Sequence, residues 1–238
     1  MSLSCIKSEL FRSQVLDCGQ DPVWRAFASC ALAVGCTLVA AIATGEPVVV
    51  DDFEGPRIRW QIGPTDTAFK ILSHQRVHSP VHSGSWSEFM RLVGQGGSFV
   101  YATLEIGRAH VIDELAFSVW LRSDRPGLQL AARVVLPRTQ DPNTGKPTTI
   151  RIYGEQYQDV GSWQQISLDS IVQRIMRQAR IVRSGDGMDI DPREAYIDRL
   201  LINVYGGQGT TNVWIDDLEI RGFVGQQIDS AITATGKP

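Results

Sequence analysis

The sequence has no cysteine beyond residue 36. Its four cysteines, Cys5, Cys18, Cys30 and Cys36, all lie near the N-terminus of the 238-residue chain, so the rest of the chain has no disulfide to stabilise it. A domain without disulfides depends on its own hydrophobic core or on a bound metal. The roughly 200 residues that remain are enough to bury such a core.

The chain also lacks a concentration of positive charge. Its formal net charge is -3 and its isoelectric point is near 5.8, which gives no basic stripe for nucleic acid. After residue 43 there is neither a G-x-S-x-G elbow nor a cysteine nucleophile. Glycoside cleavage by a pair of carboxylates remains an alternative, because the separation of the two groups in space decides that chemistry. The candidates are Glu155 and Glu194.

Long uncharged runs are scarce, and the one that stands out spans residues 26–43. It reads AFASCALAVGCTLVAAIA, follows Arg25 and ends in Ala41-Ile42-Ala43, the small-x-small pattern of a signal-peptidase site. We therefore expect residues 1–43 to be an N-terminal extension plus signal peptide, and the protein to be secreted or held in the cell envelope. A retained membrane anchor is the alternative. The polar residues 225–238 are expected to form a disordered tail or a truncated linker.

Between these ends, short segments of alternating hydrophobicity are separated by Gly, Pro, Asn and Asp. Along 114–122, Leu115, Phe117, Val119 and Leu121 share one face, and Trp120 falls on the more polar face. We expect a long loop to cover Trp120, with a ligand platform as the alternative. The predicted strands are 48–53, 58–62, 69–72, 88–93, 99–106, 114–122, 128–136, 148–153, 163–168, 199–205 and 212–220. This pattern predicts an all-β domain over 48–224.

One segment has a helical period instead. Apolar residues from Leu168 to Val182 recur at steps of three and four, which predicts one short amphipathic helix over about 169–183, capped by Asp169. Its basic face carries a row of arginines that could attract an anionic sugar, although a solvated helix face is the commoner meaning of such a row. The row consists of Arg174, Arg177, Arg180 and Arg183.

Acidic residues follow the first predicted strand and lie within the last one. The first segment reads VVVDDFEG (48–55) and the last reads NVWIDDLEI (212–220). The first and last strands of an antiparallel sandwich often lie side by side, so these carboxylates are expected to meet. Such an oxygen cluster suits calcium.

The histidines His74, His78 and His82 are evenly spaced. A four-residue step of extended chain covers about 13 Å, too far for one ion to bind all three without a fold-back.

Several segments together resemble galactose-binding-like jelly rolls, and more nearly the carbohydrate-binding modules that accompany secreted glycoside hydrolases. They are DDFEG, VHSGSWSEFMRL, ELAFSVWLRS and VWIDDLEI. The segments RVVLPRTQDPNTGKPTTIRIYGEQY and AYIDRLLINVYGGQG look like a domain found near the N-terminus of large exported planctomycete proteins. The resemblance implies an antiparallel jelly-roll β-sandwich.

The resemblance also implies a structural calcium that ties the first strand to the last. The matching positions are Glu54 and Asp217, with Asp52 and Asp216 as alternates. Sugar binding in such modules uses aromatic stacking and hydrogen bonds to hydroxyls. The candidates are Tyr153, Tyr157, Trp163, Arg133, Arg138 and Gln156, with Trp60 or Trp86 in loops.

We therefore expect an exported, non-catalytic module that binds a polysaccharide or other glycan. Its partners would include a downstream catalytic domain or a cell-surface protein, and no nucleic acid. Two alternatives remain: a structural domain that packs on a protein partner, and a jelly-roll polysaccharide lyase or glycoside hydrolase with a deep cleft and perturbed carboxylates.

Overall fold

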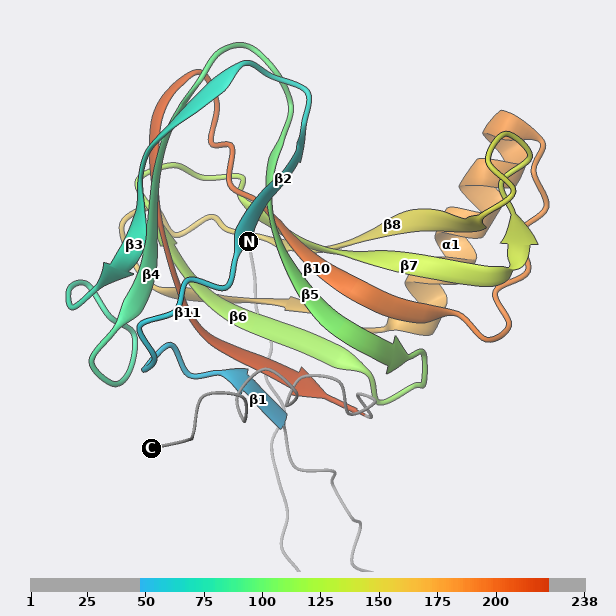
Figure 1. Ribbon diagram of the computed structural model, residues 1–238, viewed down its shortest axis with the longest axis horizontal. Helices are drawn as coiled ribbons and strands as arrows, with labels where there is room; N and C mark the ends of the chain where they lie inside the picture. Colours follow the sequence, from blue (N-terminus) through green and yellow to red (C-terminus); the bar gives the residue numbers. More distant parts are fainter. Residues whose placement is uncertain (1–47, 223–238) are drawn as a thin grey trace, which may run out of the picture. The chain divides into compact units, whose positions relative to one another are not determined.

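The computed structural model describes residues 48–222, which form one β-sandwich with a single helix among the described elements (Figure 1). The expected signal segment and the C-terminal tail lie outside these residues. In the described part, no helix combines the length and hydrophobicity needed to cross a membrane. The strands are β1 (Val48–Asp51), β2 (Gln61–Thr65), β3 (Phe69–Val77), β4 (Ser87–Gly94), β5 (Val100–His110), β6 (Ala116–Ser123), β7 (Gln129–Gln140), β8 (Pro147–Gln156), β9 (Gln164–Leu168), β10 (Tyr196–Asn203) and β11 (Gly209–Arg221).

Two antiparallel sheets make the sandwich, which confirms the predicted jelly roll. One sheet has the order β3-β4-β11-β6-β9, with β1 also paired to β11. The other has the order β2-β5-β10-β7-β8. Each segment predicted as a strand overlaps one of these strands, because the alternation of apolar and polar residues marks a half-buried strand directly.

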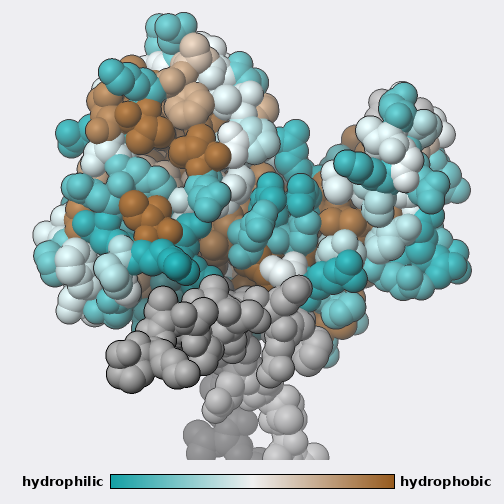
Figure 2. Space-filling model, viewed as in Figure 1, coloured by the Kyte–Doolittle hydropathy of each residue, from teal (hydrophilic) through white to brown (hydrophobic). Residues whose placement is uncertain are grey.

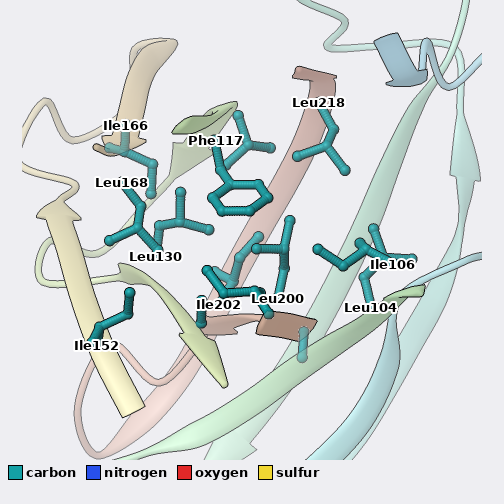
Figure 3. Packing of buried hydrophobic residues seen from close by; sticks show 14 of the residues in the cluster. Leu104, Ile106, Phe117, Leu130, Ile152, Ile166, Leu168, Leu200, Ile202 and Leu218 are labelled. Carbon is teal, nitrogen blue, oxygen red and sulfur yellow. The ribbon is translucent and has the colours of Figure 1, made fainter. Parts of the chain in front are cut away.

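The core lies between the two sheets. Figure 3 shows Phe117 and Leu218 of one sheet pointing toward Leu130, Leu200 and other residues of the opposite sheet. On β6, the predicted inward set of Phe117, Val119 and Leu121 is buried to 99% or more, so period two gives the correct face. This core stands in place of the missing disulfides.

The helix α1 (Ile171–Asp186) follows β9 and contacts β8. Ile171 and Ile175 are buried in the core, whereas Met176 is 42% exposed. The predicted cap at Asp169 is wrong. Ser170 occupies the N-cap with a left-handed backbone (φ 51°) and makes no side-chain capping bond. Asp169 instead pairs with Arg174, whose Nη2 lies 3.3 Å from its Oδ1.

Candidate functional site

The outer face of the five-stranded sheet carries aromatic and polar side chains. On β5, Val100 and Ala102 face the core, so the alternating residues Tyr101 and Thr103, and Phe99 just before the strand, face outward. Tyr101 packs with Ala131 and Leu201 in a small apolar cluster of its own, and Phe99 packs against this cluster. The surface therefore has an apolar floor that is separate from the main core.

Two cross-strand rows extend this floor over β5, β10, β7 and β8. The first row pairs Thr103, Leu201, Ala131 and Tyr153 in register. The second pairs Tyr101, Asn203, Gln129 and Gln156. An apolar strip thus lies beside a strip of amide side chains. On the side of the described chain drawn in Figure 2, hydrophobic residues likewise form separate patches among hydrophilic ones.

Two tyrosines on this face have different environments. Tyr153 is 40% exposed, whereas Tyr101 is only 4% exposed. Burial, and then a hydrogen bond with Tyr153, raise the pKa of Tyr101 to about 12, so its hydroxyl keeps its proton at neutral pH. The guanidinium of Arg151 lies 5.4 Å from the ring centroid of Phe99 and 5.3 Å from that of Tyr101. These cation-π contacts hold the rings in place.

Ion pairs continue the face beyond the aromatic rings. Arg133 Nε donates to Asp198 Oδ1 at 2.9 Å and its Nη2 donates to Oδ2 at 2.5 Å, a bidentate pair. These hydrogen bonds raise the pKa of Arg133 above its ordinary value. Arg199 pairs with Glu105. A groove of about 290 Å³ lies here, lined by Pro64, Phe99, Arg133, Thr149, Ile150, Arg151, Arg199 and Leu201.

Of the six residues predicted to bind a ligand, Tyr153, Arg133 and Gln156 belong to this sheet face. Four further residues of this face were not predicted from the sequence: Phe99, Tyr101, Arg151 and Arg199. The signal was present in the period of two, because Phe99 and Tyr101 alternate with Val100 and Ala102 along β5.

The structure places Tyr157 in the core instead of on the surface. Its side chain is fully buried, and its hydroxyl lies 2.6 to 3.1 Å from the carbonyl oxygens of Ser123, Asp159 and Ser162. Its ring is therefore closed to a ligand. Trp60 is likewise fully buried.

The two remaining candidates lie outside the two cross-strand rows, Arg138 further along β7 and Trp163 before β9. Arg138 pairs with Asp191 and Glu194, which precede β10. Trp163 lies before β9, with its ring centroid 5.8 Å from that of His82.

The first and last strands lie side by side, as the acidic segments predicted. β1 pairs antiparallel with the end of β11, with Val48 opposite Ile220 (Figure 1). Residues 82–86 are bound both by Glu54, which follows β1, and by Asp216 and Asp217 of β11. We call this segment the β3–β4 loop.

Hydrogen bonds fix the β3–β4 loop to these carboxylates. Glu54 Oε1 accepts from the backbone N–H groups of Ser85 (2.7 Å) and Trp86 (3.2 Å). Asp217 Oδ1 accepts from Ser83 Oγ at 2.7 Å. Gly84 lies between them with a φ of 58°, and a Cβ there would come within 2.1 Å of Glu54 Oε1. Only glycine allows this close approach.

His82 belongs to the same loop and covers Trp120, as expected for a tryptophan on a polar face. The two rings are stacked with centroids 3.7 Å apart. His82 N–H donates to Asp216 Oδ2 at 2.8 Å, and His82 Nδ1 lies 2.5 Å from Asp217 Oδ2. Burial raises the pKa of Asp216 to about 6, against the opposing effect of the backbone N–H groups of His82, Ser83 and Asp217 that donate to its carboxylate.

The acidic residues fit the predicted calcium only in part. Glu54, Asp216 and Asp217 converge on one loop, but their oxygens accept hydrogen bonds from it. Asp52 Oδ1 accepts from the N–H of Glu54 at 3.1 Å. Over residues 48–222, no group of three His, Cys, Asp or Glu side chains is arranged to hold a metal ion. Calcium stays a prediction.

The other candidate groups each have a protein partner. His74 Nε2 lies 2.7 Å from Glu88 Oε1, and His78 Nδ1 lies 3.1 Å from the carbonyl of Ser85. Glu155 Oε2 accepts from the N–H of Ser167 at 3.0 Å. Together with the Glu194–Arg138 pair, these contacts give each of the groups a structural role.

No protein-family model matches the chain. No curated protein matches it either. The chain is similar to several solved structures. One comes from work on the promiscuous specificity of carbohydrate-binding modules of the β-sandwich superfamily, with 10% identity and a TM-score of 0.42. The match covers 72% of this chain and 61% of that one.

A family 30 carbohydrate-binding module of a Clostridium thermocellum cellulosomal cellulase is 11% identical, with a TM-score of 0.43. The match covers 75% of this chain and 99% of that one. A xylan-binding domain from Paenibacillus barcinonensis is 12% identical, with a TM-score of 0.39 and coverage of 74% and 94%.

Proposed function

We propose that residues 48–222 form a non-catalytic carbohydrate-binding module whose ligand lies across the outer face of the five-stranded sheet. The observation that supports this most directly is the composition of that face. It combines the exposed ring of Tyr153, the partly exposed ring of Phe99 packed on the buried cluster of Leu201 and Ala131, and amides that can bind hydroxyls. Sugars present the complementary chemistry, because a pyranose ring has an apolar face and a polar rim.

The binding mechanism follows from how rigid the face is. Arg151 lies over Phe99 and Tyr101, and Asn203 binds locally, since its Oδ1 accepts from the N–H of Val100 at 3.1 Å. Side chains that are already held lose little conformational freedom when a ligand binds. In this proposal Tyr153 stacks on the sugar, and Gln129 and Gln156 bind its hydroxyls.

The proposal extends to where the protein works. The apolar run at residues 26–43 predicts export, which would place the module beside extracellular polysaccharides. A downstream catalytic domain or a cell-surface protein would be its partner.

Isothermal titration of the full-length protein with a panel of neutral and acidic polysaccharides tests the proposal. At least one glycan should bind, and Tyr153→Ala should weaken that binding by about tenfold because a stacking contact is lost. The matched control is Trp86→Ala. Although the sequence made Trp86 a candidate, it lies in the β3–β4 loop with its ring centroid 3.4 Å from that of His78, so its loss should leave binding unchanged. Loss of binding in the control alone, or no binding to any glycan, would contradict the proposal.

A further inference from the structure

Three arginines lie in one cross-strand row on the proposed binding face. Arg199 of β10 is the register partner of Arg133 on β7, and Arg133 is the register partner of Arg151 on β8. Like charges directly opposite one another destabilise a sheet. Negative charge close to such a row would offset this repulsion and stabilise the sheet.

The protein supplies only part of that charge. Asp198 binds Arg133 with both carboxylate oxygens. Glu105 pairs with Arg199, but its side chain is 77% exposed, so water weakens the pair. Within residues 48–222, Arg151 has no carboxylate partner and contacts aromatic rings instead. The row therefore keeps one positive charge that no side chain neutralises.

A second observation, an unsatisfied hydrogen-bond donor, points to a ligand at the same row of arginines. Arg199 Nε is buried and has no hydrogen-bond partner in the described part of the chain. A buried donor without an acceptor is unusual and invites one. All three arginines line the groove of about 290 Å³, together with apolar groups of Phe99 and Leu201.

We infer that this groove binds the carboxylate of a uronic acid, so that the ligand of the module is an acidic polysaccharide. This inference rests on the proposed function and names its ligand class. The guanidinium fork of Arg151 matches the two oxygens of a planar carboxylate. The adjoining apolar floor accommodates the sugar ring that carries it. Neutral glycans would leave the positive charge of the row unpaired.

The test is isothermal titration of the full-length protein with polygalacturonate, alginate and a glucuronan, each beside its carboxyl-reduced neutral form. At least one acidic polymer should bind, and its reduced form should bind more weakly by roughly tenfold or more. Dextran sulfate serves as a second anion. It should bind less tightly than the preferred uronate, because sulfate is not planar.

Two substitutions at one position sharpen the test. Arg151→Gln should weaken uronate binding by roughly tenfold. Arg151→Lys keeps the charge but loses the fork, so it should recover only part of the affinity. The matched control is Arg177→Gln, which removes one exposed arginine on α1 and should leave affinity unchanged.

The outcomes separate the two proposals. Equal binding of the acidic and reduced polymers, full recovery with lysine, or tighter binding of dextran sulfate would overturn the uronate inference and leave a carbohydrate-binding module standing. No binding to any polymer, acidic or neutral, would overturn both.

Discussion

His82 stacks on Trp120 with ring centroids 3.7 Å apart and ring planes 16° from parallel. The two residues belong to different parts of the six-stranded sheet: Trp120 lies on β6, and His82 lies in the β3–β4 loop. His82 also contacts β11, since its backbone N–H donates to Asp216 and its imidazole contacts Asp217, so this one residue joins the loop to two strands.

Replacing His82 should therefore destabilise the sandwich. His82→Ala removes the stacking contact and the bond to Asp217, and we expect the free energy of unfolding to fall by about 1–3 kcal/mol. Urea unfolding measures the loss. His110→Ala, at the exposed end of β5, is the control and should stay within about 0.5 kcal/mol of the wild type. An equal loss in both variants would contradict the structural role of His82.

The raised pKa of Asp216 makes stability depend on pH. Its pKa lies at about 6 in the folded protein against an ordinary value of 3.8, so the folded state binds more protons between these values. The contribution of Asp216 to the free energy of unfolding should thus fall as pH rises from about 4 to about 6, by up to about 3 kcal/mol.

Asp216→Asn checks this pH dependence. Relative to the wild type, the variant should gain stability as pH rises through that window in urea unfolding. Asp217 and the imidazole of His82 are the titratable neighbours of the group, and both remain in the variant. Asp113→Asn, which removes a charge at an exposed turn, gives the baseline. A constant difference between the Asp216→Asn variant and the wild type from pH 4 to 7 would refute the prediction.

Tyr157 should matter for stability and not for ligand binding. Tyr157→Phe removes the buried hydroxyl that lies among three carbonyl oxygens, of which those of Ser123 and Asp159 keep a backbone donor, and we expect a loss of about 1–3 kcal/mol. Thermal and urea unfolding measure it, and titration with the bound glycan should show unchanged affinity. Tyr196→Phe, on β10, is the control and should change stability by less than about 0.5 kcal/mol.

The predicted calcium has a simple test. Calcium should raise the midpoint of thermal unfolding relative to a chelator, since an ion that binds only the folded state stabilises it. The rise should disappear in Glu54→Gln and persist in Glu105→Gln, which lies on the other sheet. Equal midpoints of thermal unfolding with calcium and with chelator would contradict the predicted calcium site.

The fold follows closely from the sequence because a strand's period is a local property. Alternation in residues 114–122 gives both the position of β6 and the side that Phe117 buries. The same rule stops at the end of a strand. Tyr157 follows β8 directly, and its ring turns into the core because the chain leaves the sheet there.

The candidate site needed information that the sequence does not carry. Arg133, Arg151 and Arg199 belong to three strands, and only the strand order places them in one row. Arg138 and Trp163 were predicted to bind the same ligand as Tyr153, but in the structure Arg138 pairs with Asp191 and Glu194, and Trp163 lies beside His82. The proximity of the acidic segments could be predicted from the sequence, because the pairing of first and last strands is a general feature of such sandwiches.

The pairing of β1 with the end of β11 brings residues 48 and 222 to the same edge of the sandwich. A short linker could therefore close the polypeptide into a ring, and new ends could be opened at the exposed turn of Asn143 and Thr144 between β7 and β8. A circular permutant made in this way would keep both sheets and the arginine row. It would also carry a fused protein on the rim beside β7 and β8.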